Sequence, residues 1–467
     1  MSIRNCATTH SRPFRLAALA AALSAMAVST AGAQQAFGRP DTAFEGTVRA
    51  TSPLVLPGGE VELAGRGFKP GQSVTLSRGG TVLNPTPYVA GDDGSFTAKL
   101  QLPADAVPGR HPVVVVADNP DAALVFELKI SPQIPLSGQD GFAIAGEKRG
   151  QGLYQSAYSA KNDALFVTSA IGRPPVTQSE LLKVDPQTLE ILARTSPAKV
   201  PGRDDGRVYA VYGVGVDDAN GNVWVTNTRD DTVAVYRQSD LSLLKQFDAG
   251  TVPHSRDVIV DQRRGKAYAS ATGENFISVF DARTLAFVKN IEIASTVRGE
   301  KFVPMSLELD ETSGKLFTVS IGTPEAAVID TAKDTVDNVF KLSNASSASG
   351  VAYDAANARL LVVSQGSDNL LFVDVASGNT IFDVPVGAGP LNVAFDPVAK
   401  LTYVSNRASG TVTVVDGSGR IVGNLDGGTF PNHVHEDGKG NVFAINKARG
   451  EDDAEGDRIT RIAPKQR

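Results

Sequence analysis

The residues of this chain that could do chemistry are mostly cations in its longer loops. They are Arg149, Arg173, Arg203, Arg207, Arg229, Arg256, Arg298, Lys301, Arg407, Lys447 and Arg449. The planar guanidinium group of arginine suits carboxylate and phosphate, because it can donate two parallel hydrogen bonds to either. We therefore expect a ligand-binding site for an anion, and its candidate residues are Arg149, Arg229, His254, Arg256, Arg298, Arg407 and Lys447.

The same cations have acidic neighbours in the sequence, which gives a second interpretation. Surface charges of opposite sign commonly pair, and such pairs contribute little to stability or function. The acids beside the cations are Asp204, Asp205, Asp230, Asp231, Asp257 and Glu300. Both interpretations stay open on the sequence alone.

In the repeat described below, one position of the first strand holds a small or aliphatic residue in five of the seven copies. The other two copies have an ionisable residue there. The equivalent positions are Ala157, Gly215, Ile259, Glu308, Ala352, Ala394 and His435. We expect Glu308 and His435 to face a central channel, where burial would shift the pKa of each. Hydrogen bonding to channel water or backbone is the alternative role of both.

Metal and nucleophile chemistry has little support. No Ser/His/Asp arrangement and no H-E-x-x-H motif is visible. We expect His433 and His435, two residues apart, to point to opposite faces of a strand and not to share a metal. Asn227, Asn406 and Asn446 stand at equivalent positions and could join a lactonase-like metal cluster, but strand-ending asparagine is usually structural.

An acidic loop offers one further cofactor hypothesis. Glu451, Asp452, Asp453, Glu455 and Asp457 supply oxygen ligands that could hold calcium. Their spacing is not that of an EF-hand, and a solvated acidic loop is the competing interpretation. We predict no other metal site, and the cofactor stays unknown.

The elements that must position these residues follow a segment typical of a signal peptide. Residues 1–33 contain three arginines, an apolar run from Leu16 to Val28 and Ala31-Gly32-Ala33, which predicts cleavage after Ala33 and a periplasmic or secreted protein. No later apolar run is long enough to span a membrane. At 467 residues the chain is expected to hold two or three domains.

Cysteine content and charge exclude several functions. The one cysteine, Cys6, lies in the predicted signal peptide. The mature chain would therefore have no disulfide, thiolate metal site, covalently attached c-type haem or cysteine nucleophile. A net charge of −6 does not indicate nucleic acid as a partner.

Two architectures follow along the chain. Residues 47–131 show short segments of alternating apolar residues separated by turns such as "GDDGSF", which predicts an immunoglobulin-like β-sandwich without the cysteines and tryptophan of antibodies. Residues 34–46 and 132–139 are expected linkers. Residues 140–467 are expected to form a β-propeller.

The propeller prediction depends on a repeat. Its second strand recurs seven times, as "LFVTS", "VWVTN", "AYASA", "LFTVS", "LLVVS", "TYVSN" and "VFAIN". Seven such copies predict seven four-stranded blades. The last copy ends at its third strand, so we expect the strand near Ala143–Ala145 to pair with the one near Ile459–Ile462 and complete the last blade. The fold class is therefore all-β, a sandwich followed by a closed seven-bladed propeller.

The stretches "WVTNTRDDTVAVYR" and "YVSNRASGTVTVVD" resemble the YVTN-type repeat of the YncE-like seven-bladed propellers. This resemblance implies an exported protein and no particular reaction. We expect a binding or scaffold protein whose loop-rich face holds a small anionic ligand, a glycan or a protein. The alternatives are an exported metal-dependent hydrolase or lyase, with its site at the channel mouth, and a haem or quinone redox module.

Overall fold

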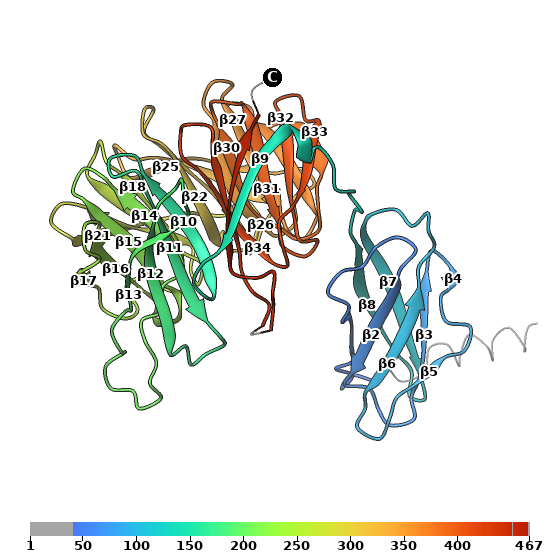
Figure 1. Ribbon diagram of the computed structural model, residues 1–467. Coiled ribbons are helices and arrows are strands. Elements are labelled where there is room, and N and C mark those ends of the chain that lie inside the picture. Colours follow the sequence, from blue (N-terminus) through green and yellow to red (C-terminus); the bar gives the residue numbers. More distant parts are fainter. Residues whose placement is uncertain (1–40, 451, 466–467) are drawn as a thin grey trace, which may run out of the picture. The chain divides into compact units, whose positions relative to one another are not determined.

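The structure, a computed structural model, describes residues 41–450 and 452–465 (Figure 1). The predicted signal peptide, Cys6 and Glu451 lie outside the described residues. The chain divides into two compact units, the first mainly within residues 60–101 and 111–128 and the second mainly from residue 129 onwards. Within the described residues, no helix has the length and apolar character needed to cross a membrane.

The first unit contains two antiparallel sheets. One has the order β1-β2-β6, and in the other β4, β3, β7 and β8 follow one another while β5 also pairs with β3. Val61 and Leu63 are buried and their neighbours Glu60 and Glu62 are exposed, which is the alternation that the sequence predicts. The strands are β1 (Thr47–Ala50), β2 (Glu60–Arg66), β3 (Ser73–Arg78), β4 (Thr81–Val82), β5 (Tyr88–Val89), β6 (Phe96–Gln101), β7 (Gly109–Asp118) and β8 (Ala122–Ile130).

The second unit consists of four-stranded antiparallel sheets, and in all but the last the strands follow one another in chain order. The first strands of successive sheets contact one another, and the first strand of the last sheet contacts that of the first. The first strands are β10 (Leu153–Ser159), β14 (Val214–Asp217), β18 (Ser255–Asp261), β22 (Pro304–Asp310), β26 (Ala348–Asp354), β30 (Pro390–Asp396) and β34 (Pro431–Glu436). This ring of contacts is the arrangement of a β-propeller.

The second strands are buried along almost their whole length, because each sheet is covered on both faces by its neighbours. They are β11 (Ala164–Ile171), β15 (Asn222–Asn227), β19 (Lys266–Ala271), β23 (Lys315–Ser320), β27 (Arg359–Ser364), β31 (Leu401–Asn406) and β35 (Val442–Asn446). The third strands are β12 (Gln178–Val184), β16 (Thr232–Arg237), β20 (Phe276–Asp281), β24 (Glu325–Asp330), β28 (Asn369–Asp374), β32 (Thr411–Asp416) and β36 (Arg458–Pro464).

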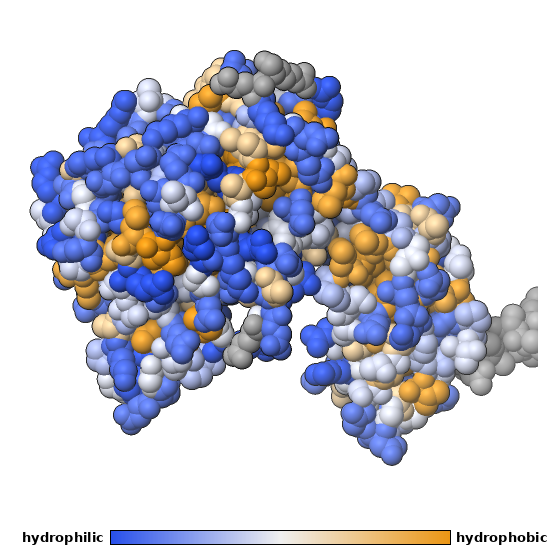
Figure 2. Space-filling model, in the orientation of Figure 1, coloured by the Kyte–Doolittle hydropathy of each residue, from blue (hydrophilic) through white to orange (hydrophobic). Residues whose placement is uncertain are grey.

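The outer strands complete the sheets and are more exposed. They are β13 (Ile191–Thr195), β17 (Leu243–Gln246), β21 (Ala286–Glu292), β25 (Thr335–Lys341), β29 (Thr380–Pro385), β33 (Ile421–Asp426) and β9 (Phe142–Lys148). Some carry exposed apolar residues such as Leu192 and Phe287, while most of the surface of this unit seen in Figure 2 is hydrophilic.

The last sheet takes its outer strand from the start of the unit. Strand β9 pairs antiparallel with β36, with Ala145 opposite Arg461 and Ile144 opposite Ile462 (Figure 1). The pairing predicted from the sequence is confirmed.

Aspartate ends most of the first strands for a local reason. The Asp261 carboxylate accepts a hydrogen bond from the Arg264 amide at 3.1 Å, and Asp217 accepts one from the Asn220 amide at 3.0 Å. An aspartate at this position therefore stabilises the turn into the second strand. The seventh first strand ends at Glu436, and Asp437 follows it directly.

Candidate functional site

Five cations of the second unit gather at one end of the ring of first strands. The start of a first strand and the end of the second strand lie at the same end of an antiparallel sheet. Side chains from these positions of different sheets can therefore meet. We call this group the mouth cluster, and it consists of Arg229, Arg256, Arg407, Lys447 and Arg449 with the rings of Tyr154, Tyr212 and Phe430.

One half of the mouth cluster surrounds Tyr154, at the start of β10. The Arg256 guanidinium lies 5.7 Å from the centre of the Tyr154 ring, and the Lys447 ammonium lies 5.0 Å from it. Tyr212 packs edge-on against the same ring, with centroids 4.9 Å apart, and its hydroxyl contacts Arg229. The electron-rich face of an aromatic ring attracts cations, so Tyr154 holds two of them near each other.

The other half surrounds Phe430, in the loop before β34. The Arg407 guanidinium lies 3.9 Å from the centre of this ring, and the Arg449 guanidinium lies 5.4 Å from it. Arg407 is close enough to Arg256 and Arg449 for their charges to repel, so the two halves of the cluster are adjacent. The two sides of the channel mouth therefore carry charge of the same sign.

The charges of the mouth cluster are poorly neutralised. Arg256 is 6% exposed and its Nη1 atom has no hydrogen-bond partner, and the buried Nε of Arg407 also has none. Burial and neighbouring cations lower the pKa of Arg407 and of Lys447. Within residues 41–450 and 452–465, no member of the cluster forms an ion pair with an acid.

The acids nearest to the mouth cluster are engaged elsewhere. Asp257, next to Arg256, accepts a hydrogen bond from the Leu307 amide at 3.0 Å, and burial raises its pKa. Asp230 pairs with Arg207. The unit thus holds cations together without placing a free carboxylate between them.

His254 lies at the edge of the mouth cluster. Partial burial, Arg229 and Arg256 lower its pKa, against an opposing effect of Asp231. The neutral ring could donate a hydrogen bond to a bound anion.

Two predicted site residues do not join the mouth cluster. Arg149 donates to the Leu189 carbonyl at 2.9 Å, and one of its nitrogens lies 3.5 Å from Glu147. Arg298 is exposed, and no contact joins it to the cluster. The paired-charge interpretation describes other loop cations, and these pairs are Arg203–Asp205, Arg207–Asp230 and Lys301–Glu274.

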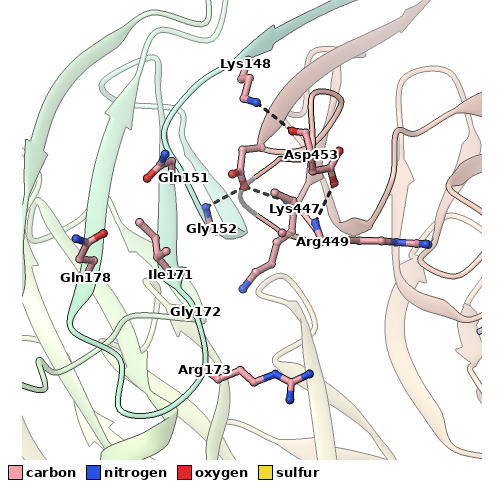
Figure 3. A pocket seen from close by; sticks show the side chains of 13 residues that line it. Lys148, Gln151, Gly152, Ile171, Gly172, Arg173, Gln178, Lys447, Arg449 and Asp453 are labelled. Atoms are coloured by element: carbon pink, nitrogen blue, oxygen red, sulfur yellow. Dashed lines mark hydrogen bonds between the residues drawn. The ribbon is translucent and has the colours of Figure 1, made fainter.

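A pocket of about 410 Å³ adjoins the mouth cluster between the first and last sheets. Lys447 and Arg173 point toward the same space, while Arg449 extends away from it (Figure 3). Gln151 and Gln178 line the opposite side of this pocket. A ligand in the pocket would therefore meet both a cation and neutral amides.

Acids of the loop predicted as a calcium site accept hydrogen bonds from backbone amides at this pocket. Asp457 accepts hydrogen bonds from the amides of Gly152, at 2.9 Å, and Ala448, at 3.1 Å. Asp453 accepts one from the Arg449 amide at 2.9 Å. In the described part of the chain, no three acidic or histidine side chains are grouped so as to hold a metal ion.

The channel below the mouth is lined by acidic side chains in place of cations. A cavity of about 340 Å³ is lined by Glu308, His435, Glu436 and Asp257, among others. Burial, then repulsion from Glu436 and Asp257, raises the pKa of Glu308 to about 8. Burial raises the pKa of Glu436 to about 7 and lowers that of His435 to about 4. Glu308 is therefore mostly protonated at neutral pH, while His435 is uncharged.

The expectation that His433 and His435 point to opposite faces is wrong. Their rings are nearly parallel, with centroids 6.3 Å apart. The physical reason is that residues two apart on a strand share a face. His433 Nδ1 accepts a hydrogen bond from the Ser156 amide at 3.3 Å, so one of its nitrogens is already occupied.

The three equivalent asparagines have structural roles. Asn227 donates to the Tyr209 carbonyl at 3.0 Å, and Asn406 donates to the Thr413 hydroxyl at 2.7 Å. Asn446 accepts a hydrogen bond from the Phe430 amide at 2.7 Å, which fixes the loop that carries the Phe430 ring.

Sequence reasoning missed the aromatic members of the mouth cluster. Tyr154, Tyr212 and Phe430 all stand at or just before the first strand of a sheet. Aromatic residues at that position in three copies of the repeat are a signal that could have been read together with the cations. Arg449 was recognised as a loop cation but was not among the candidate ligand-binding residues.

Comparison with known proteins supports the fold. No protein-family model matches the chain. Among solved structures, streptogramin B lyase has a TM-score of 0.54 at 11% identity and covers 70% of this chain and 100% of its own. Virginiamycin B lyase from Staphylococcus aureus has a TM-score of 0.53 at 13% identity and covers 69% and 99%. Hydrazine synthase from Kuenenia stuttgartiensis has a TM-score of 0.52 at 18% identity and covers 63% and 92%.

Sequence comparison gives a more specific likeness. The uncharacterized protein YncE of Salmonella typhimurium is 24% identical over 331 residues, which cover 67% of this chain and 89% of that protein. YncE of Escherichia coli K12 is 24% identical over 260 residues, which cover 53% and 69%. The chain is therefore similar to the YncE proteins, and its second unit has a propeller-type fold.

Proposed function

We propose that this protein binds a small anion at the mouth cluster. The observation that carries the proposal is Arg256, a guanidinium group that is almost wholly buried and has a nitrogen without any partner. Removing a charge from water costs free energy unless another charge or hydrogen bonds compensate for it. A carboxylate or phosphate between Arg256, Arg407 and Lys447 would supply both.

The architecture supports binding at this place. We infer that the seven sheets form a seven-bladed propeller over residues 140–467, whose loops carry the ligand site on a rigid ring. We further infer that residues 47–131 form an immunoglobulin-like spacer, and that the predicted signal peptide directs the protein to the periplasm or the outside of the cell. The ligand would then be a solute of that compartment.

A hydrolase or lyase is less well supported. Two of the similar solved structures are lyases, but an identity below 15% carries only the fold. The asparagines that could have completed a metal cluster are bonded within the protein. The mouth cluster itself offers cations and tyrosines and is better suited to holding an anion than to moving a proton.

The test is a calorimetric titration with citrate and with phosphate, at low and at moderate salt. Replacing both Arg256 and Arg407 by glutamine should weaken binding at least about 100-fold, since each charged hydrogen bond contributes about 1.5–3 kcal/mol. Arg203→Gln is the matched control, because Arg203 lies on the same face but pairs with Asp205 at 2.8 Å. Absence of binding at low salt, or equal binding by the double variant, would end the proposal.

A further inference from the structure

The pocket beside the mouth cluster continues into a second pocket. The first holds about 410 Å³ and the second also holds about 410 Å³. Gln151, Ile171 and Gln178 line both pockets, which therefore adjoin each other, and we refer to the two together as the groove. Their combined space exceeds what a single small anion requires.

The two ends of this groove differ in charge. The end next to the mouth cluster contains Lys447 and Arg173, and Arg173 forms no ion pair with any described residue. At the far end Arg194 lies 3.6 Å from Glu180, so its charge is balanced. A ligand that fits the groove is therefore anionic at one end and neutral along the rest.

The neutral part of the groove offers hydrogen-bonding groups and one apolar side chain. Gln151, Gln178, Thr177 and Ser196 are exposed, and their side chains form no hydrogen bond with the rest of the described chain. An amide both donates and accepts hydrogen bonds, as a sugar hydroxyl does. Ile171, which is half-buried between the two pockets, can pack against the C–H face of a sugar ring.

We propose that the groove extends the anion site, and that the ligand is an oligosaccharide with an acidic sugar at one end. This inference rests on the proposed function, because the acidic sugar would place its carboxylate between Lys447 and the arginines of the mouth cluster. The neutral sugars would lie over Ile171 and exchange hydrogen bonds with Gln151 and Gln178.

A single-stranded nucleic acid fits the groove less well. Binding of such strands combines a continuous cationic track with aromatic rings on which the bases stack. No aromatic residue lines either pocket, and the far end has no net positive charge. Acidic sugar is therefore the ligand that the observed groups match.

The probe is an aldotriouronic acid, in which one glucuronate is linked to two neutral sugars. Its affinity is compared by calorimetry with that of glucuronate alone, the neutral trisaccharide and an oligothymidylate. We expect the acidic trisaccharide to bind about tenfold more tightly than glucuronate, from one or two additional hydrogen bonds. Replacing Gln151 and Gln178 together by alanine should remove this gain.

Both glutamines are exposed, so this double variant should fold, and its melting temperature checks that it does. Arg256→Gln should weaken glucuronate and the acidic trisaccharide equally. Equal affinity of wild type for these two ligands, equal binding of the neutral trisaccharide, or tighter binding of the oligothymidylate would overturn the inference. Binding of citrate or phosphate without either acidic sugar would also overturn it but leave the proposed function standing, whereas failure of all four anions would end both.

Discussion

The mouth of the channel and its interior treat their charges in opposite ways. At the mouth, carboxylates such as Asp457 bond to backbone amides, while one nitrogen each of Arg256 and Arg407 lacks a hydrogen-bond partner. In the interior, Glu308 and Glu436 repel each other, and no cation is paired with either. One ring of strands thus has cations at its mouth and carboxyl groups in its interior.

This difference indicates which of the two regions would bind an external group. An interior carboxyl can lose its charge by taking up a proton, and the raised pKa of Glu308 shows that it does so near neutral pH. A guanidinium group keeps its charge at any physiological pH, so only an anion can compensate for it. The mouth is therefore the region where we propose that a ligand binds.

The largest expected effect concerns an acid of the mouth. Asp457 is 5% exposed, and one of its oxygens accepts hydrogen bonds from the amides of Gly152, Leu153 and Ala448. Asp457→Ala would leave these amides without partners and should lower the free energy of unfolding by about 2–4 kcal/mol. Urea unfolding at neutral pH measures it.

Asp452→Ala is the matched control for this change, because Asp452 is an exposed acid of the same loop. Its free energy of unfolding should stay within about 0.5 kcal/mol of wild type. If Asp457→Ala is as stable as this control, the hydrogen bonds from backbone amides to Asp457 do not stabilise the mouth. The contrast between the mouth and the interior would then be wrong.

The second effect concerns the interior. The pKa of Glu308 is about 8 in the folded state, against an ordinary value of 4.5. Folding therefore favours its protonated form, and the stability associated with it is complete below pH 4.5 and lost as the pH rises toward 8. Glu308→Gln removes this loss, so the variant should gain roughly 1–2 kcal/mol relative to wild type between pH 5 and pH 8.5.

This gain is smaller than the full pKa shift would give, because the Glu308 side chain is partly exposed to the channel. Urea unfolding at the two pH values measures it. Glu292→Gln, on the exposed outer strand β21, should leave the difference between the two pH values as in wild type. A constant offset between Glu308→Gln and wild type at both pH values would contradict a buried, titrating carboxyl.

The smallest effect is expected outside both regions. Arg298 is an exposed loop cation with no contact to the mouth cluster. Arg298→Gln should change the free energy of unfolding by less than about 0.5 kcal/mol and should not change the affinity for citrate. A clear loss of affinity would mean that the anion site extends to that loop and that the mouth cluster is larger than the residues named above.

Much of the propeller could be predicted because its signals are local. An aspartate that ends a strand bonds within its own turn. In the first unit, the alternation of buried residues likewise follows from the period of the strand. The pairing of β9 with β36 could be predicted as well, because the last copy of the repeat has one strand fewer than the others. These features need no knowledge of how distant loops meet.

The candidate site was predictable only in part, because its geometry depends on how loops that are distant in the sequence come together. Arg149 and Arg256 look alike in the sequence, but the first bonds to the Leu189 carbonyl and the second lies over Tyr154. Asp230 is adjacent to Arg229 but pairs with Arg207, so neighbours in sequence did not identify ion pairs. Only the closed arrangement of the loops decides which charges remain without a partner.

The pairing of β9 with β36 also sets an order of events during synthesis. Lys148 is opposite Arg458, so these partners are separated by 458 − 148 = 310 positions of the chain. The ribosome releases β9 early, and the edge of this strand must stay unpaired until β36 has also been released. The last sheet is therefore completed after the others, and a chain that stops before β36 would leave an open ring with an exposed strand at its edge.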